Sequence, residues 1–180
     1  MVVVDLLPVP QISSSKLVVS SSPGQIGCRV LLVDDSALNR KMMNRLLTRK
    51  GYICYEAEDG TNAVDLVAES MLPTSTLSYE LIIMDNIMPK LSGPLATTSI
   101  RMMGYIGVVI GVTGNALPED ITEFKSHGAD AVLSKPLDIS DFEMTLRGLN
   151  SAGAACISPS SKAGGFLPTV KQGIHPPINE

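Results

Sequence analysis

Three short, uninterrupted apolar runs constrain the fold of this chain more than any other feature. They cover residues 30–33 (VLLV), 81–84 (LIIM) and 108–110 (VVI). A strand with one face in water alternates apolar and polar side chains, whereas continuous runs are typical of parallel strands buried on both faces. Residues 53–55 and 131–133 are weaker strand candidates. The sequence therefore predicts a parallel sheet that is covered on both sides.

Helical patterns lie between these runs. Residues 37–50 place the apolar side chains of Leu38, Met42, Leu46 and Leu47 at helical spacing, with Gly51 as a stop. A last helix follows Asp138, a good N-cap residue, and its apolar side chains also recur three and four apart: Ile139, Phe142, Leu146 and Leu149. Strands and helices thus alternate about five times. This pattern predicts an α/β fold, a doubly wound five-stranded parallel sheet with helices on both faces.

The 180 residues have room for one domain of ordinary size with additional segments at its ends. We expect the domain to span residues 28–150. Residues 1–27 contain a Ser-rich stretch that ends in Pro-Gly, and we expect a disordered leader or linker there. Residues 151–180 are rich in Ser, Ala, Gly and Pro without a sustained apolar period, and we expect a disordered tail.

Composition excludes several functional classes. Fourteen Lys and Arg against 18 Asp and Glu give a net charge of −4, so we expect no direct nucleic-acid partner. Cys28, Cys54 and Cys156 lie far apart without a Cys-x-x-Cys pair, which indicates a reducing compartment and no zinc site. No apolar stretch is long enough for a membrane span, and the N-terminus lacks a cationic region. We therefore expect a soluble, cytoplasmic protein.

Polar residues whose side chains can bind ligands or take part in reactions follow the strand candidates directly. Asp34 and Asp35 follow the first run, Asp85 follows the second, and Thr113 follows the strand that contains the third. Lys135 comes shortly after residues 131–133. In an open α/β sheet the ligand crevice lies at the carboxyl ends of the strands. We therefore expect these side chains to converge although they are remote in sequence.

Such a cluster favours one kind of chemistry. Three carboxylates repel one another, and burial adds a desolvation cost, so they persist together most easily when a cation neutralises them. Oxygen ligands with open positions suit Mg²⁺, which also binds phosphate oxygens. A lysine and a hydroxyl at the same edge complete what phosphoryl transfer requires, and a carboxylate can serve as the nucleophile. The residues predict an aspartyl phosphate.

Each residue taken singly also has an ordinary structural interpretation. An aspartate after a strand is often a helix cap, Thr113 could cap a helix that begins near Leu117, and Lys135 could be a solvated charge. We interpret His127, before Gly128, as a structural residue at a helix end.

In combination, the motifs resemble the response-regulator receiver domains of two-component phosphorelays. The resemblance covers about residues 28–147 and rests on LLVDDS (31–36), MDNIMPKLSG (84–93), GVTGNAL (111–117) and GADAVLSKPL (128–137). It implies the flavodoxin-like receiver fold. The sequences TGNAL and LSKPL are most similar to those of receivers attached to hybrid histidine kinases.

The resemblance assigns roles to residues of this chain. It implies that Asp85 is the phospho-acceptor and that Asp34 and Asp35 are the acidic pair that binds Mg²⁺, together with Asp85 and the main-chain carbonyl of Ile87. No other cofactor is implied. The phosphoryl donor is then a phosphohistidine on a histidine kinase or a histidine phosphotransfer protein.

The remaining site residues follow from the same resemblance. Thr113 is the hydroxyl that contacts the phosphoryl group, Lys135 is its cationic partner, and the Lys135-Pro136 bond is cis, which suits a tight turn. Val132 departs from the family pattern, because many receivers carry an aromatic residue there that changes rotamer on activation.

Three alternatives compete with a signalling phospho-acceptor. A metal-dependent phosphatase with an aspartate nucleophile needs an acid two residues further on, where this chain has Ile87. A P-loop NTPase needs G-x-x-x-x-G-K-[ST], which is missing from the sequence. A degenerate receiver that acts only as a binding module would not need the intact set of acidic, hydroxyl and lysine residues. We expect no enzyme beyond catalysis of its own phosphorylation and dephosphorylation, because 180 residues leave no room for an ATP-dependent kinase core.

Overall fold

The structure, a computed structural model, describes residues 27–151. Strands and helices alternate five times in this part of the chain. The strands are β1 (Arg29–Val33), β2 (Ile53–Ala57), β3 (Leu81–Asp85), β4 (Val108–Thr113) and β5 (Ala131–Ser134). The helices are α1 (Ala37–Thr48), α2 (Gly60–Ser70), α3 (Gly93–Met102), α4 (Pro118–Ser126) and α5 (Ile139–Ser151). Apart from their boundary residues, the expected leader and tail lie outside the described residues.

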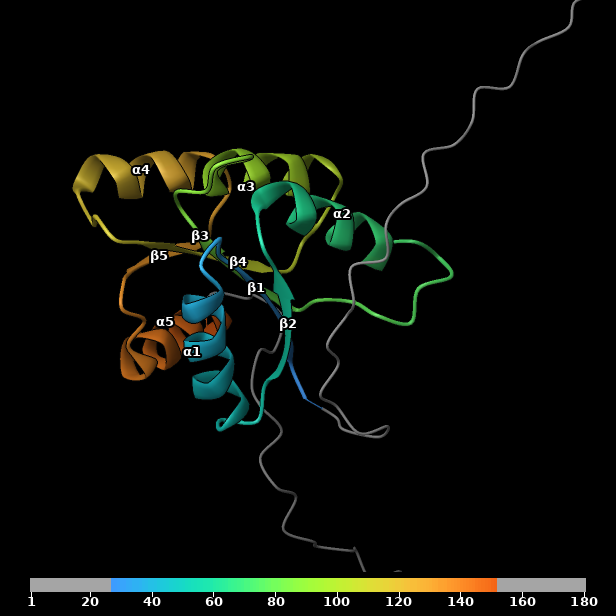
Figure 1. Cartoon of the computed structure of the whole chain (residues 1–180), viewed down its shortest axis with the longest axis horizontal. Helices are drawn as coiled ribbons and strands as arrows, with labels where there is room; N and C mark the ends of the chain where they lie inside the picture. Colours follow the sequence, from blue (N-terminus) through green and yellow to red (C-terminus); the bar gives the residue numbers. More distant parts are fainter. Residues whose placement is uncertain (1–26, 152–180) are drawn as a thin grey trace, which may run out of the picture.

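The five strands form one parallel sheet in the order β2-β1-β3-β4-β5 (Figure 1). The order reverses between β1 and β3, which is the topological switch point of a doubly wound sheet. Register aligns the carboxyl ends, since Val33 pairs with Met84, Asp85 with Val112, and Thr113 with Ser134. The predicted fold class is confirmed.

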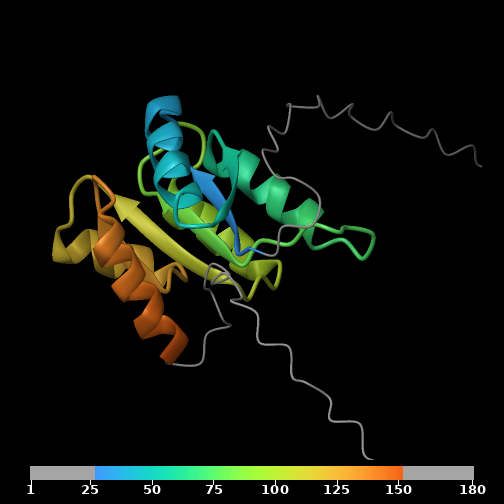
Figure 2. The same cartoon turned by 90° about the horizontal axis from the view of Figure 1, so that it is seen from below.

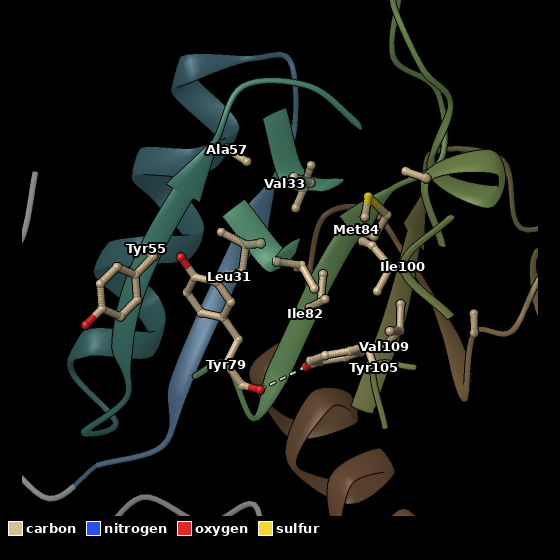
Figure 3. Packing of buried hydrophobic residues seen from close by; sticks show 14 of the residues in the cluster. Leu31, Val33, Tyr55, Ala57, Tyr79, Ile82, Met84, Ile100, Tyr105 and Val109 are labelled. Atoms are coloured by element: carbon tan, nitrogen blue, oxygen red, sulfur yellow. Dashed lines mark hydrogen bonds between the residues drawn. The ribbon is translucent and has the colours of Figure 1, made fainter. Parts of the chain in front are cut away.

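Helices cover both faces of the sheet. α1 and α5 lie on one face, and α2, α3 and α4 lie on the other (Figures 1 and 2). Every residue of β3 and β4 is buried, which explains their continuous apolar sequences. Figure 3 shows part of the core beneath α2 to α4, where the Tyr105 hydroxyl donates to the Tyr79 carbonyl oxygen at 3.1 Å.

The predicted apolar face of α1 is wrong in part. The helix buries Met43 and Leu47 against the sheet, whereas Leu38 is 67% exposed and Met42 is 58% exposed. The helix carries two apolar stripes, because residues four apart share a face, and Leu47 belongs with Met43. Packing on the sheet selects that stripe and leaves the one that begins at Leu38 in solvent.

Helix ends follow local chemistry that the sequence indicated. α1 ends at Thr48, slightly before the predicted end, and Gly51 then takes a φ of 90°, which favours glycine. At α5, the Asp138 carboxylate accepts from the main-chain N–H groups of Ser140 (2.7 Å) and Asp141 (3.1 Å), as expected of an N-cap.

Gly93, the first residue of α3, lies directly against the carboxyl end of β3. A Cβ at this position would overlap the main-chain carbonyl oxygen of Asp85. A Cβ on Gly148, inside α5, would meet no atom within 4 Å. Gly93 is therefore required because the backbones approach closely, whereas at Gly148 only the general preference of helices for alanine over glycine applies.

We predict that Gly93→Ala lowers the free energy of unfolding by about 1–3 kcal/mol, because the backbone must move to admit the methyl group. Gly148→Ala should raise it by about 0.5–1 kcal/mol, because alanine is the better helix former. Urea unfolding of both variants measures these changes. Equal effects of the two substitutions would contradict the close approach at Gly93.

Candidate functional site

The polar residues singled out in the sequence gather at one edge of the sheet. Asp85 and Thr113 are the last residues of β3 and β4, while Asp34 and Lys135 follow β1 and β5. The Lys135 main-chain N–H donates to the Thr113 carbonyl oxygen at 2.7 Å, so the two strand ends are joined. The expected convergence is present in the structure.

Three carboxylates form the acidic part of the site. Asp34, Asp35 and Asp85 each offer one oxygen, and these oxygens all lie within 4.8 Å of one another. Asp34 is 0% exposed and Asp85 is 6% exposed, whereas Asp35 faces solvent. The cluster thus forms a pocket in which the carboxylates of Asp34 and Asp85 are buried and that of Asp35 is accessible to solvent.

Lys135 connects the two buried carboxylates. Its Nζ lies 2.8 Å from Asp34 Oδ2 and 2.7 Å from Asp85 Oδ1. The lysine side chain is 27% exposed, so its ammonium group sits between the pocket and solvent. The Lys135 ammonium therefore forms ion pairs with two of the three carboxylates, and the pocket keeps an excess of negative charge.

The carboxylate of Asp34 is held by donors from several directions. Its Oδ1 accepts from the Ser36 main-chain N–H (2.8 Å) and from Asn39 Nδ2 (3.2 Å), and its Oδ2 accepts from Asn39 Nδ2 (3.2 Å) and Lys135 Nζ (2.8 Å). Arg40 also donates to the Asp34 carbonyl oxygen at 2.6 Å. Asn39 and Arg40 were not predicted as site residues. Their place in the first turn of the helix after Asp34 is the only signal that the sequence offers.

Electrostatics of the pocket favour a bound cation. Burial, reinforced by the charge of Asp34, raises the pKa of Asp85 above its ordinary range, although the Lys135 ammonium acts in the opposite direction. Burial on its own lowers the pKa of Lys135, but hydrogen bonds to Asp34 and Asp85 outweigh it and raise the pKa. A second cation near Asp85 would stabilise its charged form.

The Thr113 hydroxyl is engaged with its own loop. It donates to the Asn115 carbonyl oxygen at 3.1 Å and accepts from the Asn115 main-chain N–H at 3.1 Å. Asn86 Nδ2 lies 3.4 Å from the same oxygen. Thr113 does not cap α4, whose N-cap is Leu117. Because a hydroxyl has one proton, contact with a phosphoryl oxygen requires release of Asn115.

The structure also places the other predicted residues. Ile87 lies in the loop after β3 with 76% of its surface exposed, and the Lys135-Pro136 peptide bond is cis. Val132 is half-buried in β5. His127 is the C-cap of α4, and its Nδ1 lies 2.7 Å from the Thr98 hydroxyl oxygen, which suits a structural residue.

The donor set fits Mg²⁺. Carboxylate oxygens are hard ligands that magnesium prefers, and the exposed side of the pocket leaves room for waters and phosphate oxygens. The cluster contains no thiolate or imidazole, the ligands that favour zinc. Asp34, Asp35 and Asp85 together thus give the pocket oxygen atoms and a negative charge that suit this metal.

The fold and site together define a doubly wound α/β protein with an acidic pocket, a lysine and a hydroxyl at its switch point. The family model of the response regulator receiver domain matches residues 30–147. The chain belongs to this family, and it is a receiver domain of two-component phosphorelay signalling. As a receiver it is a phospho-acceptor domain and not a kinase.

Similar proteins include both response regulators and hybrid kinases. The chain is 39% identical to the two-component response regulator ORR41 of Oryza sativa subsp. japonica over 111 residues, covering 61% of this chain and 84% of that protein. It is 34% identical to the hybrid signal transduction histidine kinase I of Dictyostelium discoideum over 140 residues, covering 75% of this chain and 8% of the kinase. The predicted likeness to hybrid-kinase receivers is therefore confirmed.

A solved structure supports the assignment to the receiver family. The receiver domain of the histidine kinase CKI1 from Arabidopsis thaliana, complexed with Mg²⁺ and BeF₃⁻, matches with a TM-score of 0.61 and 29% identity, covering 69% of this chain and 90% of that one. The chain spans 8 to 12% of the length of the curated histidine kinases it matches.

The comparisons and the structure bear on the remaining expectations. The metal-dependent phosphatase is not favoured, since the chain matches the receiver family. Among residues 27–151, no helix is both long and apolar enough to cross a bilayer. The expected lack of a nucleic-acid partner and the cytoplasmic location stay predictions.

We predict that Asp85→Asn stabilises the domain without metal at neutral pH. The native state binds the Asp85 proton more tightly than the unfolded state, because its pKa is raised above the ordinary 3.8. Stability is therefore lost as pH rises through this range, and asparagine avoids the loss. With EDTA present, we expect a melting temperature higher by roughly a few degrees at pH 7, with the difference vanishing below about pH 3.8.

Asp65→Asn, on the exposed surface of α2, is the matched control and should leave the melting temperature nearly unchanged. A melting temperature of Asp85→Asn at or below wild type at pH 7 would show that the ionised Asp85 is not destabilising.

We predict that phosphoryl binding alters the Thr113 loop most. Addition of beryllofluoride and Mg²⁺ should change amide exchange mainly in residues 113–117 and in α4, because the Thr113 proton leaves Asn115 for the new anion. The change around Val132 should be modest, since a β-branched valine is small and stiff at χ1. Exchange that changes chiefly around Val132, and scarcely in residues 113–117, would refute this order of events.

Proposed function

We propose that Asp85 accepts a phosphoryl group from the phosphohistidine of a partner protein, in a step that depends on Mg²⁺. The observation that carries the proposal is the placement of one carboxylate at the end of β3 within ion-pair distance of Lys135 and beside two further acids. These groups supply a nucleophile, a fixed cation and a metal site in one pocket.

In the proposed step, a carboxylate oxygen of Asp85 attacks the phosphorus atom. A P–O bond forms, the P–N bond to the donor imidazole breaks, and the imidazole nitrogen keeps the electron pair. Lys135, already 2.7 Å from Asp85 Oδ1, is positioned to pair with one phosphoryl oxygen. Thr113 can donate to another once it releases Asn115.

We further propose how the carboxylates divide their work. The four donor contacts to Asp34 occupy the roughly four acceptor sites of a carboxylate. Asp34 therefore contributes its charge and orients Lys135, whereas Asp35 and Asp85, with the Ile87 carbonyl, are the groups available as direct ligands. Bound Mg²⁺ would neutralise charge on the pocket and on the incoming phosphoryl group.

The exposed stripe of α1 supports a protein donor. Leu38, Met42 and Leu46 line a hollow of about 380 Å³ together with the cationic side chains Lys41, Arg45 and Arg49. Met42 also lines a second hollow, of about 310 Å³, that reaches Asp34 and Lys135. We propose that a histidine kinase or histidine phosphotransfer protein with an apolar surface bordered by acidic residues docks here, because this apolar and cationic surface continues into the phosphorylation site.

We predict that acetyl phosphate with Mg²⁺ adds one phosphoryl group to the full chain, and that mild alkali removes it because an acyl phosphate is labile. Intact-mass spectrometry measures both steps. Asp85→Asn should abolish the addition, while Asp141→Asn in α5, outside the carboxylate pocket, should be labelled like wild type. Labelling of Asp85→Asn at the wild-type rate would refute Asp85 as the acceptor and place the phosphoryl group on another residue. No labelling of the wild-type chain would favour a binding module.

A further inference from the structure

The loop that joins β3 to α3, residues 86–92, follows the phospho-acceptor directly. Backbone hydrogen bonds fix its two ends: the Asn86 N–H donates to the Val112 carbonyl oxygen at 2.9 Å, and the Gly93 N–H donates to the Asn86 carbonyl oxygen at 2.9 Å. Between these points Met88 is buried in the core beneath α2 to α4, whereas the Ile87 side chain is 76% exposed. A polar contact further along the loop adds to the packing of Met88.

Lys90 provides a contact in this part of the loop. Its Nζ lies 2.6 Å from Oδ2 of Asp59, a residue 31 positions earlier in the chain. Asp59 is the N-cap of α2, and its Oδ1 accepts from the Asn62 main-chain N–H at 2.9 Å. The ion pair therefore joins the phosphorylation loop to the first turn of a neighbouring helix.

The adjacent backbone shows that this contact is tight. A Cβ on Gly60, the residue after Asp59, would overlap the main-chain carbonyl oxygen of Leu91. The loop and the helix thus meet at two consecutive pairs of residues. Asp59 and Lys90 form an ion pair, and the backbones of Gly60 and Leu91 lie in close contact. α2 and α3 lie side by side above the sheet in Figure 1, with this contact near their N-terminal ends.

The Asp59 carboxylate is buried and charged, and this favours its pairing with Lys90. The Asp59 side chain is only 5% exposed, whereas the Lys90 side chain is 65% exposed. Burial on its own would raise the pKa of Asp59, but hydrogen bonds from Lys90 and from the α2 backbone hold it below the ordinary range. Without the Lys90 ammonium, this buried carboxylate would keep only its helix-cap hydrogen bonds as compensation for its charge.

We propose that Lys90 is a positioning residue for metal binding, and that its ion pair with Asp59 holds the 86–92 loop, and with it the Ile87 carbonyl, in one conformation beside Asp85. This inference rests on the proposed function, because it takes the Ile87 carbonyl to be a ligand of Mg²⁺.

The test measures Mg²⁺ affinity by isothermal titration calorimetry on the full chain. Lys90→Gln should weaken Mg²⁺ binding roughly tenfold, at the lower end of the effect of outer residues that orient metal ligands. Lys90→Arg, which keeps the charge, should retain most of the affinity. Lys50→Gln is the matched control, since Lys50 forms a comparable ion pair with Glu143 at 2.8 Å that joins the end of α1 to α5.

A second variant separates the pair from the helix cap. Asp59→Asn keeps an acceptor for the Asn62 N–H but removes the charge, and asparagine is a good N-cap. It should weaken Mg²⁺ binding about as much as Lys90→Gln, and the double variant should lose little more, as expected when both changes remove one interaction. Amide exchange of residues 86–92 should increase in both variants and not in Lys50→Gln.

The outcomes distinguish this inference from the proposed function. Wild-type Mg²⁺ affinity and unchanged exchange in Lys90→Gln, with binding lost in Asp35→Ala, would overturn the role of Lys90 and leave the metal site intact. A wild-type chain that binds Mg²⁺ no better than Asp35→Ala would instead overturn the metal site itself.

Discussion

The interaction on which the site depends is the contact of one ammonium group, that of Lys135, with two buried carboxylates. It joins residues 101 positions apart in sequence, Asp34 and Lys135, and brings Asp85 into the same pocket. The cation offsets the repulsion between the two buried acids but cannot neutralise all three. The remaining negative charge favours a divalent cation in the pocket, and we predict that the same charge imbalance destabilises the fold when no metal is bound.

The parallel sheet makes this contact possible. Its register brings the ends of β1, β3, β4 and β5 to one edge, and helices cover both faces. Close backbone approaches then fix the surrounding loops, with Gly93 against Asp85 and Gly60 against Leu91. Functional side chains thus lie at the ends of the strands, and the Thr113 hydroxyl can respond to a phosphoryl group by releasing the Asn115 carbonyl oxygen.

Sequence patterns predicted the sheet and the acidic site because both depend on local signals. Continuous apolar runs identified β3 and β4, and the residues that end or follow the strands had to meet at the sheet edge. The buried face of α1 could not be predicted in the same way, since two apolar stripes compete and contact with the sheet decides between them. Asn39 and the pair of Asp59 with Lys90 were missed for a related reason, because their roles arise from contacts between side chains on different elements.

If the side chain of Asp85 becomes an acyl phosphate, chemical trapping can locate the modification to this single residue. Borohydride reduces an acyl phosphate to an alcohol, which converts a phosphorylated aspartate into homoserine. After phosphorylation and reduction, peptide mass spectrometry should therefore find homoserine at position 85 and unmodified aspartate at positions 34 and 35. Homoserine at another acid, with Asp85 unchanged, would contradict the account.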